Sequence, residues 1–464
     1  MTEADPIQHV IVLMLENCSF DRMLGACQTF KSGIDGVSPD GQPRINSFDG
    51  QQYRQQPGAS RVVVNDPHHD TPHVLQQLKA DANGNPNSGF VQDYASGLQS
   101  LTSGDCSEVM KYFATDALPA FHTLARNFLV CDHWFSSVPG PTWANRLFAM
   151  SGTSLGRVSM PAGVMDMNLH WYDQATLFDR LDEQSVDWRV YFGDTPLSLL
   201  LVHQREPESL IRHKPMTEFF RDVASDPEES GFPPYVLIEP AYLDPGANDG
   251  HPPHDALASE ALIASVYNAI RANETLWQSS LLVVLCDEHG GFYDHVSPPP
   301  TVPPDHHQDE YTFDQLGPRV PAILVSPWVA NAVCPTTLDH TSLLKYLTDK
   351  WSLGPLGART GAANTFQDCI LAELRTDTPQ KIPALPASGL LPVPVQPARS
   401  LNSHENAIVA LSQGLESLAG EDAATVAARS RQMLSGPQSQ IDAAVDRVGA
   451  LLTWGSSEVQ KTLG

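Results

Sequence analysis

Positive charge is scarce in this chain. Its 464 residues include 28 Lys and Arg against 54 Asp and Glu, which gives a formal charge of −26 at pH 7. Nucleic-acid binding requires a basic surface that neutralises phosphates, so the composition excludes this class of function. The same shortage argues against electrostatic docking on anionic membranes, but not against contact with zwitterionic lipid.

Long hydrophobic runs are also missing. No apolar stretch approaches the roughly 20 residues that a membrane-spanning helix needs, so we expect no membrane span. Residues 1–6 lead almost directly into an apolar strand and contain no basic region, long apolar core or cleavage site of a signal peptide. These features predict a cytoplasmic protein, or a secreted or periplasmic one if the N-terminus has been trimmed.

The cysteines form no recognisable framework. There are seven, an odd number at scattered spacing, and several stand in apolar contexts where cysteine behaves as a small hydrophobe. No disulfide pattern is evident, and there is no cluster of the zinc-finger type. This usage also favours the cytoplasm.

Residues 281–295 form the most informative segment that the chain does contain. An apolar run predicts a buried strand, which ends in Asp287 and Glu288; two glycines then permit a tight turn, and His295 closes the segment. In an open α/β sheet, ligands bind at the carboxyl ends of strands, and adjacent carboxylates repel unless a cation or a proton lies between them. The segment therefore predicts a metal site, and the alternative is a solvated acidic turn.

A second apolar strand is predicted at residues 9–15, and it too ends in oxygen ligands. Glu16 and Asn17 offer a carboxylate and an amide oxygen directly after the strand. Ser19 is expected to be the N-cap of a short helix that starts at Phe20. Capping does not explain Glu16, because a carboxylate that directly follows a buried strand needs a partner.

A rigid turn precedes a hydroxyl at the start of a third predicted element. Residues 139–141 read Pro-Gly-Pro, and Thr142 comes next, at the start of a helix through Met150. The start of a helix presents free backbone N–H groups and the positive end of its dipole, which is a favourable place for a phosphoryl or sulfuryl group. From the residues alone two interpretations are open: Thr142 contacts such a group, or it is only the N-cap.

Together these segments resemble the signatures of the phosphoesterase family, which contains bacterial and plant non-specific phospholipases C and bacterial acid phosphatases and belongs to the alkaline-phosphatase-like superfamily. The similar segments read ENCSFD at 16–21, VPGPTWANR at 138–146 and DEHGGFYDH at 287–295. Further similar stretches lie at 66–69, 89–94, 249–255, 316–322 and 339–342. Their common order along the chain makes the resemblance specific. The sequence departs from the family pattern at Cys18, Ala144 and His289, where Arg, Pro and Asn are common.

The resemblance implies roles for individual residues. One divalent metal ion would be held by Glu16, Asn17, Asp287 and Glu288. Thr142 would be the nucleophile that takes the phosphoryl group into a covalent intermediate. Carboxylate and amide oxygens suit Ca, Mg or Mn, with Zn as a further option. The cation would lower the pKa of the Thr142 hydroxyl and neutralise charge on the phosphoryl oxygens.

Histidines supply candidates for proton transfer, because a leaving oxygen must be protonated near neutral pH. His251 and His254 flank a Pro-Pro pair that presents both rings from one loop, and His69 matches another position of the family. His295 is a further catalytic candidate.

Two residues are expected to bind the substrate or its phosphate, Asn145 and His340. His340 opens a helix predicted at 341–351, where capping and substrate contact both fit. His289 is expected to ligate metal, touch substrate or face solvent.

Alternation of strands and helices predicts an α/β fold with a mainly parallel central sheet and helices on both faces, and the resemblance implies the alkaline-phosphatase-like type. A helix is predicted at 255–277, and residues 31–108, rich in turn-forming residues, are expected to run over the rim of the active site. Strands are predicted at 9–15, 127–131, 188–192, 235–239, 281–286 and 320–325.

Three parts are expected along the chain: a phosphoesterase catalytic domain at 1–371, a Pro-rich connector at 372–400 and a helical C-terminal tail at 401–464. Gly420 and Gly436 are expected to break the tail into amphipathic helices. Either the main domain or a second copy of the chain would cover their apolar faces, so a homo-oligomer is one alternative.

The leading hypothesis is a metal-dependent phosphoric ester hydrolase that works through phospho-Thr142 and, like a phospholipase C, releases a phosphorylated headgroup from phospholipid. The first alternative is an acid phosphatase acting on phosphate monoesters, and the second is an inactive cation-dependent binding protein. A lipid substrate would need an apolar rim. Candidates for it, although aromatics beside buried strands are more often core, are Phe292, Tyr293, Trp134, Phe135 and Trp143.

Overall fold

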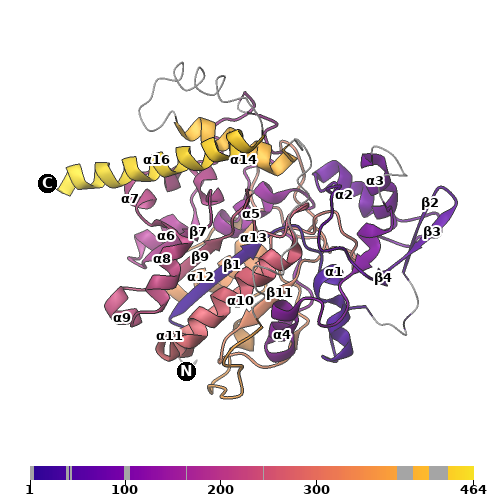
Figure 1. Cartoon of the computed structure of the whole chain (residues 1–464), viewed down its shortest axis with the longest axis horizontal. Helices are drawn as coiled ribbons and strands as arrows, with labels where there is room; N and C mark the ends of the chain where they lie inside the picture. Colours follow the sequence, from indigo (N-terminus) through magenta and orange to yellow (C-terminus); the bar gives the residue numbers. More distant parts are fainter. Residues whose placement is uncertain are drawn as a thin grey trace.

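An eight-stranded sheet forms the centre of the computed structural model (Figure 1). The structure describes residues 5–37, 41, 44–98, 105–163, 165–243, 245–383, 401–416 and 437–463. In the order in which they lie side by side, the strands are β12 (Val333–Cys334), β6 (Leu129–Cys131), β11 (Ala322–Val325), β10 (Ser280–Cys286), β1 (His9–Leu15), β9 (Tyr235–Glu239), β7 (Trp188–Phe192) and β8 (His213–Pro215).

Helices precede, connect and follow these strands. They include α1 (Phe20–Leu24), α2 (Thr71–Gln77), α3 (Phe90–Gly97), α4 (Pro119–Asn127), α5 (Thr142–Ser151), α6 (Leu177–Glu183), α7 (Pro207–Leu210), α8 (Met216–Val223), α9 (Pro227–Ser230), α10 (Ala256–Ala272), α11 (Glu274–Ser279), α12 (His340–Trp351), α13 (Gly357–Ala362), α14 (Ser403–Glu416) and α16 (Pro437–Leu463). Among the helices of the described ranges, none is both long and apolar enough to cross a membrane.

The central sheet is mainly parallel, as predicted. β1 pairs in parallel with β10 on one side and with β9 on the other. β7 and β8 continue in the same direction, and β12 runs parallel to β6. Within this sheet β11 runs against its two neighbours, β10 and β6.

Helices cover both faces of the sheet. Every residue of β1, β9 and β10 is buried. Successive side chains of a strand point to opposite faces, so burial at every position requires cover on both. This explains why β1 and β10 read as near-continuous apolar runs, HVIVLML and SLLVVLC.

The register of the sheet places the ends of β1 and β10 side by side. Leu15 is paired with Cys286, so the residues that follow them, Glu16 and Asp287, leave the sheet at the same edge. Glu239 ends β9, the neighbour of β1 on the other side. The carboxyl edge of the sheet therefore gathers acidic side chains where open α/β sheets bind ligands.

Some predicted elements differ from the observed ones at their ends. The predicted strands at 127–131 and 320–325 are shorter in the structure. The helix predicted at 255–277 is two helices, because the side chain of Asn273 accepts a hydrogen bond from the backbone N–H of Leu276 and starts α11 afresh. Ser19 caps α1 as predicted, through a bond from the N–H of Arg22.

The segment at 31–108 holds more regular structure than its sequence suggested. It contains α2, α3 and the short strands β2 (Ile45–Phe48), β3 (Gln51–Arg54) and β4 (Gln56–Pro57), which pairs with β5 (Lys111–Tyr112). Phe90 and Tyr94 of α3 pack in a separate apolar cluster with Phe292 and Tyr293. This packing ties the segment to the turn that follows β10.

The C-terminal tail is helical where the structure describes it. α14 and α16 pack against each other, and α16 also packs against α7. In Figure 1 the yellow α16 runs along the top of the molecule, and its end projects beyond the body. Most of the predicted connector, at 384–400, and the predicted breaks at Gly420 and Gly436 lie outside the described residues. The division into three parts and the homo-oligomer stay predictions.

Candidate active site

The predicted metal ligands lie together in the interior: Glu16, Asn17, Asp287 and Glu288. None of them is more than 1% exposed. The backbone N–H of Asp287 donates to the carbonyl of Leu15 (3.1 Å), and the N–H of Cys18 donates to the carbonyl of Glu288 (2.9 Å). These bonds join the turn after β1 and the turn after β10 into one unit.

A guanidinium lies between two of these carboxylates. Arg146, in α5, donates from Nε to Oδ2 of Asp287 (2.9 Å), and its Nη2 lies 3.2 Å from Oε1 of Glu16. Its Nη1 lies 3.9 Å from Oε2 of Glu239. Burial alone would lower the pKa of Arg146, but the phenol of Tyr242 and the carboxylates raise it. Arg146 is the last residue of the similar segment at 138–146, but no role was predicted for it.

The buried carboxylates around Arg146 outnumber the basic side chains that contact them. Burial raises the pKa of Glu16 and of Asp287 well above their ordinary values, and neighbouring carboxylates add to the effect while Arg146 opposes it. Burial also acts to raise the pKa of Glu288, but the imidazoles of His69 and His289 hold it below its ordinary value. Buried carboxylates in such numbers favour a bound cation.

Asn17 occupies an unusual backbone conformation, with a φ of 51°. Asparagine tolerates the left-handed region better than most residues. Gly290, with a φ of 65°, lies so close that a Cβ there would be 2.6 Å from the Cβ of Asn17. Glycine at 290 is therefore needed for Asn17 to keep its place.

Thr142 is the first residue of α5, and Pro141 occupies the N-cap position. Its side chain is fully buried, and within the described residues Oγ1 makes no hydrogen bond. The interpretation of Thr142 as an N-cap is therefore wrong. Residues four apart lie on one face of a helix, so Thr142 lies on the same face of α5 as Arg146, which contacts the carboxylates.

Asn145 holds the turn that precedes Thr142. Its Oδ1 accepts from the N–H of Val138 (3.1 Å), and its Nδ2 donates to the carbonyl of Gly140 (3.0 Å). Gly140 in turn packs against Thr71, whose hydroxyl would lie 2.6 Å from a Cβ at position 140. Both ends of the Asn145 amide serve the turn, and its predicted phosphate contact stays a prediction.

Three predicted catalytic histidines converge on this edge of the sheet. The rings of His69 and His251 lie 5.5 Å apart, and those of His251 and His254 lie 6.4 Å apart. Nδ1 of His254 pairs with Oδ1 of Asp249 at 2.7 Å, and the carbonyl of Asp249 accepts from the N–H of Glu16. The structure thus brings His69, His251 and His254 together with the predicted metal ligands.

Two of these imidazoles differ in protonation. Burial acts to lower the pKa of His69, but the carboxylates of Glu288 and Asp66 raise it to about 9, so the ring carries a proton at neutral pH. Burial, together with the neighbouring His69 and His404, lowers the pKa of His251 well below its ordinary value, so this ring is neutral. Adjacent groups with separated pKa values are suited to act as acid and base.

His340 supports the backbone of Asp287. Its Nε2 donates to the carbonyl of Asp287 (2.6 Å), and its Nδ1 accepts from Nε1 of Trp134 (3.3 Å). Asp339, not His340, is the N-cap of α12 and forms a capping box with Ser342, so the capping role is wrong. Both ring nitrogens are engaged by protein groups, and the phosphate contact of His340 stays a prediction.

His289 does not face solvent. It is fully buried, its Nε2 lies 2.8 Å from Oε1 of Gln77, and its Nδ1 lies 3.4 Å from Oε2 of Glu288. The solvent interpretation is therefore wrong.

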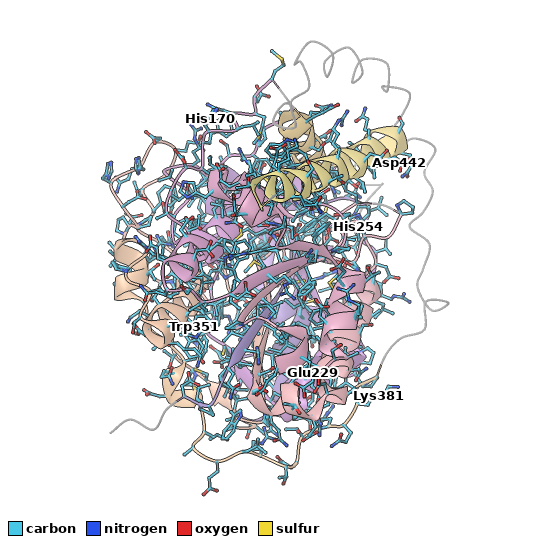
Figure 2. The ribbon with its side chains drawn as sticks, turned by 90° about the vertical axis from the view of Figure 1, so that its left-hand side faces the viewer. His170, Glu229, His254, Trp351, Lys381 and Asp442 are labelled. Carbon is cyan, nitrogen blue, oxygen red and sulfur yellow. The ribbon has the colours of Figure 1, made fainter. Side chains whose placement is uncertain are left out.

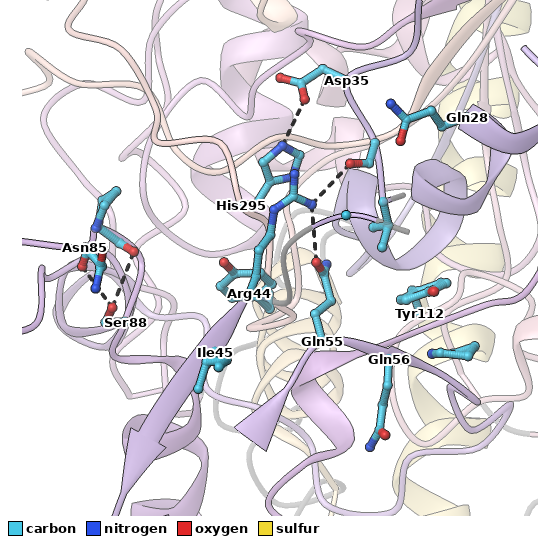
Figure 3. A pocket seen from close by; sticks show the side chains of 16 residues that line it. Gln28, Asp35, Arg44, Ile45, Gln55, Gln56, Asn85, Ser88, Tyr112 and His295 are labelled. Carbon is cyan, nitrogen blue, oxygen red and sulfur yellow. Dashed lines mark hydrogen bonds and ion pairs between the residues drawn. The ribbon is translucent and has the colours of Figure 1, made fainter. Parts of the chain in front are cut away.

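His295 belongs to a different group of charges. Its Nδ1 lies 2.8 Å from Asp21 and its Nε2 lies 3.0 Å from Asp35, while Arg319 pairs with Asp21 and Asp294. This group borders a cavity of about 830 Å³ that is shown in Figure 3. Residues labelled around it include Arg44, Gln55, Gln56, Asn85, Ser88 and Tyr112. The structure places His295 here, apart from the histidines around Glu16.

One residue beside Glu16, His404, was not among the predicted site residues. His404, in α14 of the C-terminal tail, has Nδ1 2.9 Å from Oε2 of Glu16, and its ring lies 5.5 Å from that of His251. Glu405, the next residue, lies 3.9 Å from Nε2 of His254. Figure 2 shows His254 on the side of the molecule that the tail helices cover. No motif links a tail helix to the first strand, so this contact could not be predicted from the residues.

The donor atoms present fit a metal ion. Oδ1 of Asn17 and Oε1 of Glu288 are buried without a hydrogen bond from any described residue. Two groups bring three donors within 4.8 Å of one another at this edge, and they are Glu16 with His251 and His404, and Asp66 with His69 and His251. Asp287 and Glu288 belong to neither group, so the four-ligand set stays a prediction.

The sequence is similar to known phosphoesterases over most of its length. A sequence model described as the Phosphoesterase family matches residues 7–354. Non-specific phospholipase C6 of Arabidopsis thaliana is 34% identical over 444 residues, which cover 88% of this chain and 79% of that protein. Non-specific phospholipase C3 of the same plant is 33% identical, with 83% and 77% covered.

A mycobacterial protein and a solved structure are similar to this chain at lower identity. Phospholipase C B of Mycobacterium tuberculosis is 26% identical over 393 residues, which cover 75% of this chain and 74% of that protein. A solved protein of the alkaline phosphatase superfamily from Vibrio parahaemolyticus matches 55% of this chain and 64% of its own, with a TM-score of 0.32 and 13% identity. At that TM-score the likeness carries no further argument.

Proposed function

Because this chain belongs to the phosphoesterase family, we propose that it hydrolyses phospholipids in the manner of a phospholipase C, through a phospho-Thr142 intermediate. The hydrolysis of phosphoric ester bonds is the activity of the family. The phospholipid substrate is supported by plant and mycobacterial relatives that are named phospholipases C. The observation that carries the proposal is the buried Thr142 hydroxyl at the start of α5, with no hydrogen bond among the described residues.

Phosphoryl transfer to Thr142 is the first step. A bond forms between Oγ1 of Thr142 and phosphorus, and the bond between phosphorus and the oxygen of diacylglycerol breaks. A neutral imidazole at this edge of the sheet is suited to accept the hydroxyl proton. His69, which carries a proton, is suited to give it to the leaving oxygen. Free N–H groups at the start of α5 are available to the phosphoryl oxygens.

Hydrolysis of phospho-Thr142 is the second step. Water attacks phosphorus, the bond to Oγ1 of Thr142 breaks, and the phosphorylated headgroup is released. A neutral imidazole takes the proton of the water, and a protonated one returns a proton to the threonine oxygen. The transfer thus ends with the starting protonation states restored.

A divalent metal ion is the cofactor of the proposal. Bound by Glu16, Asn17, Asp287 and Glu288, it would supply Lewis-acid chemistry that neutralises phosphoryl charge and lowers the pKa of the nucleophile. Ca, Mg, Mn and Zn are the candidate ions.

Apolar contact with lipid needs residues other than the aromatics that the sequence suggested. Phe292, Tyr293, Trp134, Phe135 and Trp143 are at most 6% exposed and belong to the core. Val64 and Leu75 are exposed apolar side chains on either side of His69 in the sequence, at 52% and 37%. We assign the lipid contact to these two.

Turnover on paired substrates tests the proposed function. The full chain, loaded with each candidate metal, is incubated with phosphatidylcholine vesicles and with a soluble aryl phosphate monoester. Release of phosphocholine that stops on chelation is the expected result. Turnover of the monoester alone would make the protein an acid phosphatase, and metal binding without turnover of either substrate would make it a binding protein.

The lipid contact has its own test. Val64→Glu and Leu75→Glu are expected to lower turnover on vesicles by more than tenfold and to leave a soluble choline-phosphate ester unaffected. Phe220→Glu, a change of the same kind at a 38% exposed side chain on α8, is the control. Equal effects of all three variants would remove Val64 and Leu75 from the lipid contact.

Assembly completes the proposal. We take the C-terminal helices as the surface through which a homo-oligomer would form. Sedimentation of the full chain and of Val445→Glu, whose side chain is 38% exposed on α16, tests this point.

A further inference from the structure

We propose that Glu16, His251 and His404 form a second cation site, suited to zinc, beside the oxygen-rich group at the end of β10. One donor atom of each residue lies within 4.8 Å of the others, and their side chains are at most 2% exposed. The site goes beyond the proposed hydrolysis, since it assigns a metal-binding role to the C-terminal tail. It shares Glu16 with the predicted four-ligand set.

Three separate parts of the chain supply the donors. Glu16 directly follows β1, His251 lies in the loop between β9 and α10, and His404 is the second residue of α14. Two imidazoles and one carboxylate are the ligand set of many open zinc sites. Imidazole nitrogen also favours Zn and Co over Mg and Ca, which prefer oxygen.

The hydrogen bonding of His251 directs a lone pair toward this group. Its Nδ1 lies 2.6 Å from the carbonyl of Pro252, which can only accept, so Nδ1 carries the proton. A longer contact of 3.4 Å from Nδ2 of Asn402 to the same nitrogen does not compete with it. Nε2 is then the unprotonated nitrogen, and none of the described residues bonds to it. Most metal-binding histidines are oriented in this way, by a hydrogen bond that the other ring N–H donates to a protein group.

An ion pair of His404 with Glu16 alone is the alternative. It accounts for the 2.9 Å between Nδ1 and Oε2, although Oε2 makes no hydrogen bond among the described residues. It also leaves the buried Nε2 of His251 without a hydrogen bond from any residue that the structure describes. A cation bound by Oε2 of Glu16, Nδ1 of His404 and Nε2 of His251 satisfies these atoms, so we favour the cation site.

The surrounding charge favours a cation as well. Asp249, Asp287 and Glu288 lie around Glu16, and Arg146 is the guanidinium that contacts it. Oε1 of Glu16 faces Arg146 at 3.2 Å, while Oε2 faces His404 at 2.9 Å. The carboxylate thus has one oxygen for the guanidinium and one for the proposed ion.

Binding at this site would couple the tail to the catalytic body. His404 belongs to α14, which packs against α16, whereas Glu16 follows the central strand β1. An ion that binds only when all three donors are in place stabilises the arrangement in which α14 lies against the sheet edge. Zinc is therefore expected to protect the tail from proteolysis in the full chain.

Zinc titration of the metal-free full chain tests the site. Wild-type protein is expected to bind Zn²⁺, and His404→Asn, which keeps a donor N–H near Nδ1 but is a poor zinc ligand, is expected to weaken that binding at least tenfold. Co²⁺ in place of Zn²⁺ should show visible absorption bands that the variant lacks. His170→Asn, an exposed histidine labelled in Figure 2, is the control.

Each result decides between the alternatives. Unchanged zinc binding by His404→Asn would overturn the proposal and leave the ion pair of His404 with Glu16. Should that variant fail to fold, as circular dichroism would show, His404→Gln is titrated in its place with the same criterion. Thr142→Ala is expected to bind zinc like the wild type and to lose turnover, so the zinc site and the proposed function can fail independently.

Discussion

Arg146 donates from Nε to Oδ2 of Asp287 across 2.9 Å, and both side chains are at most 2% exposed. The pair joins the helix that begins with Thr142 to the turn that follows β10. The catalytic nucleophile of the proposal and one predicted metal ligand are therefore held in register by a single guanidinium.

Replacing Arg146 by Met is expected to lower the free energy of unfolding by about 3–5 kcal/mol, because it leaves buried carboxylates without their partner. Urea unfolding measures this. Arg180→Met, which removes an exposed ion pair with Glu183 at 2.9 Å, is the control and should cost less than about 1 kcal/mol. Similar losses in the two variants would show that Arg146 does not compensate the carboxylates.

Gly290→Ala is expected to destabilise the protein and to displace Asn17. The new Cβ would meet the Cβ of Asn17 at 2.6 Å, and the residue has a φ of 65°. Gly231→Ala is the matched control, since Gly231 has a φ of 60° with no atom within 4 Å of the built Cβ. The control should cost about 1 kcal/mol through its φ alone, and Gly290→Ala clearly more. Equal losses would mean that Asn17 can move aside freely.

The ion pair of His295 predicts a decline of stability at alkaline pH. Burial acts to lower the pKa of His295, but Asp21 raises it to about 9 from an ordinary 6.5. A raised pKa stabilises the fold fully below about pH 6.5, and this contribution is lost as the pH rises through 9. The difference amounts to about 3 kcal/mol at most.

Unfolding free energies of wild type and His295→Gln, measured at pH 6 and at pH 9, check this. The wild type should lose more stability between the two values than the variant, while His170→Gln should behave as the wild type. Parallel pH profiles of wild type and His295→Gln would contradict the raised pKa.

Loss of a predicted oxygen ligand is expected to weaken metal binding. Asp287→Asn and Glu288→Gln keep the size of each side chain and remove its charge, so the affinity for Mg²⁺ or Mn²⁺ should fall by more than about tenfold. Isothermal titration of metal-free protein measures it. Asp349→Asn, an exposed carboxylate on α12, serves as the control. Unchanged affinity would mean that the metal binds elsewhere.

Local patterns were enough to predict the central strands of the sheet and where β1 and β10 end, but not the short edge strands β8 and β12. β1 and β10 are apolar runs that end in carboxylates, and parallel pairing brings the residues after them to one edge. Asn273 shows where such patterns fail. The apolar stripe continues past it and predicted a single helix, but the Asn273 side chain caps a second helix, α11.

Contacts between distant segments could not be predicted. His404 reaches Glu16 from the opposite end of the chain, and no periodicity or motif reports that α14 lies against the sheet edge. His295 stands in the same motif as Asp287 but is drawn into the group around Arg319. Because Asp287 and His295 are close in sequence, they were predicted to share one site. The turn at Gly290 and Gly291 instead directs them to different groups of charges.

Trapping of the covalent intermediate tests the central claim most directly. The metal-loaded full chain is mixed with a choline-phosphate ester, quenched in acid within a turnover, and its peptides are read by mass spectrometry. The account predicts a phosphocholine ester on Thr142 in the wild type, and neither that ester nor turnover in Thr142→Ala with its fold intact. Turnover by Thr142→Ala at the wild-type rate would contradict it.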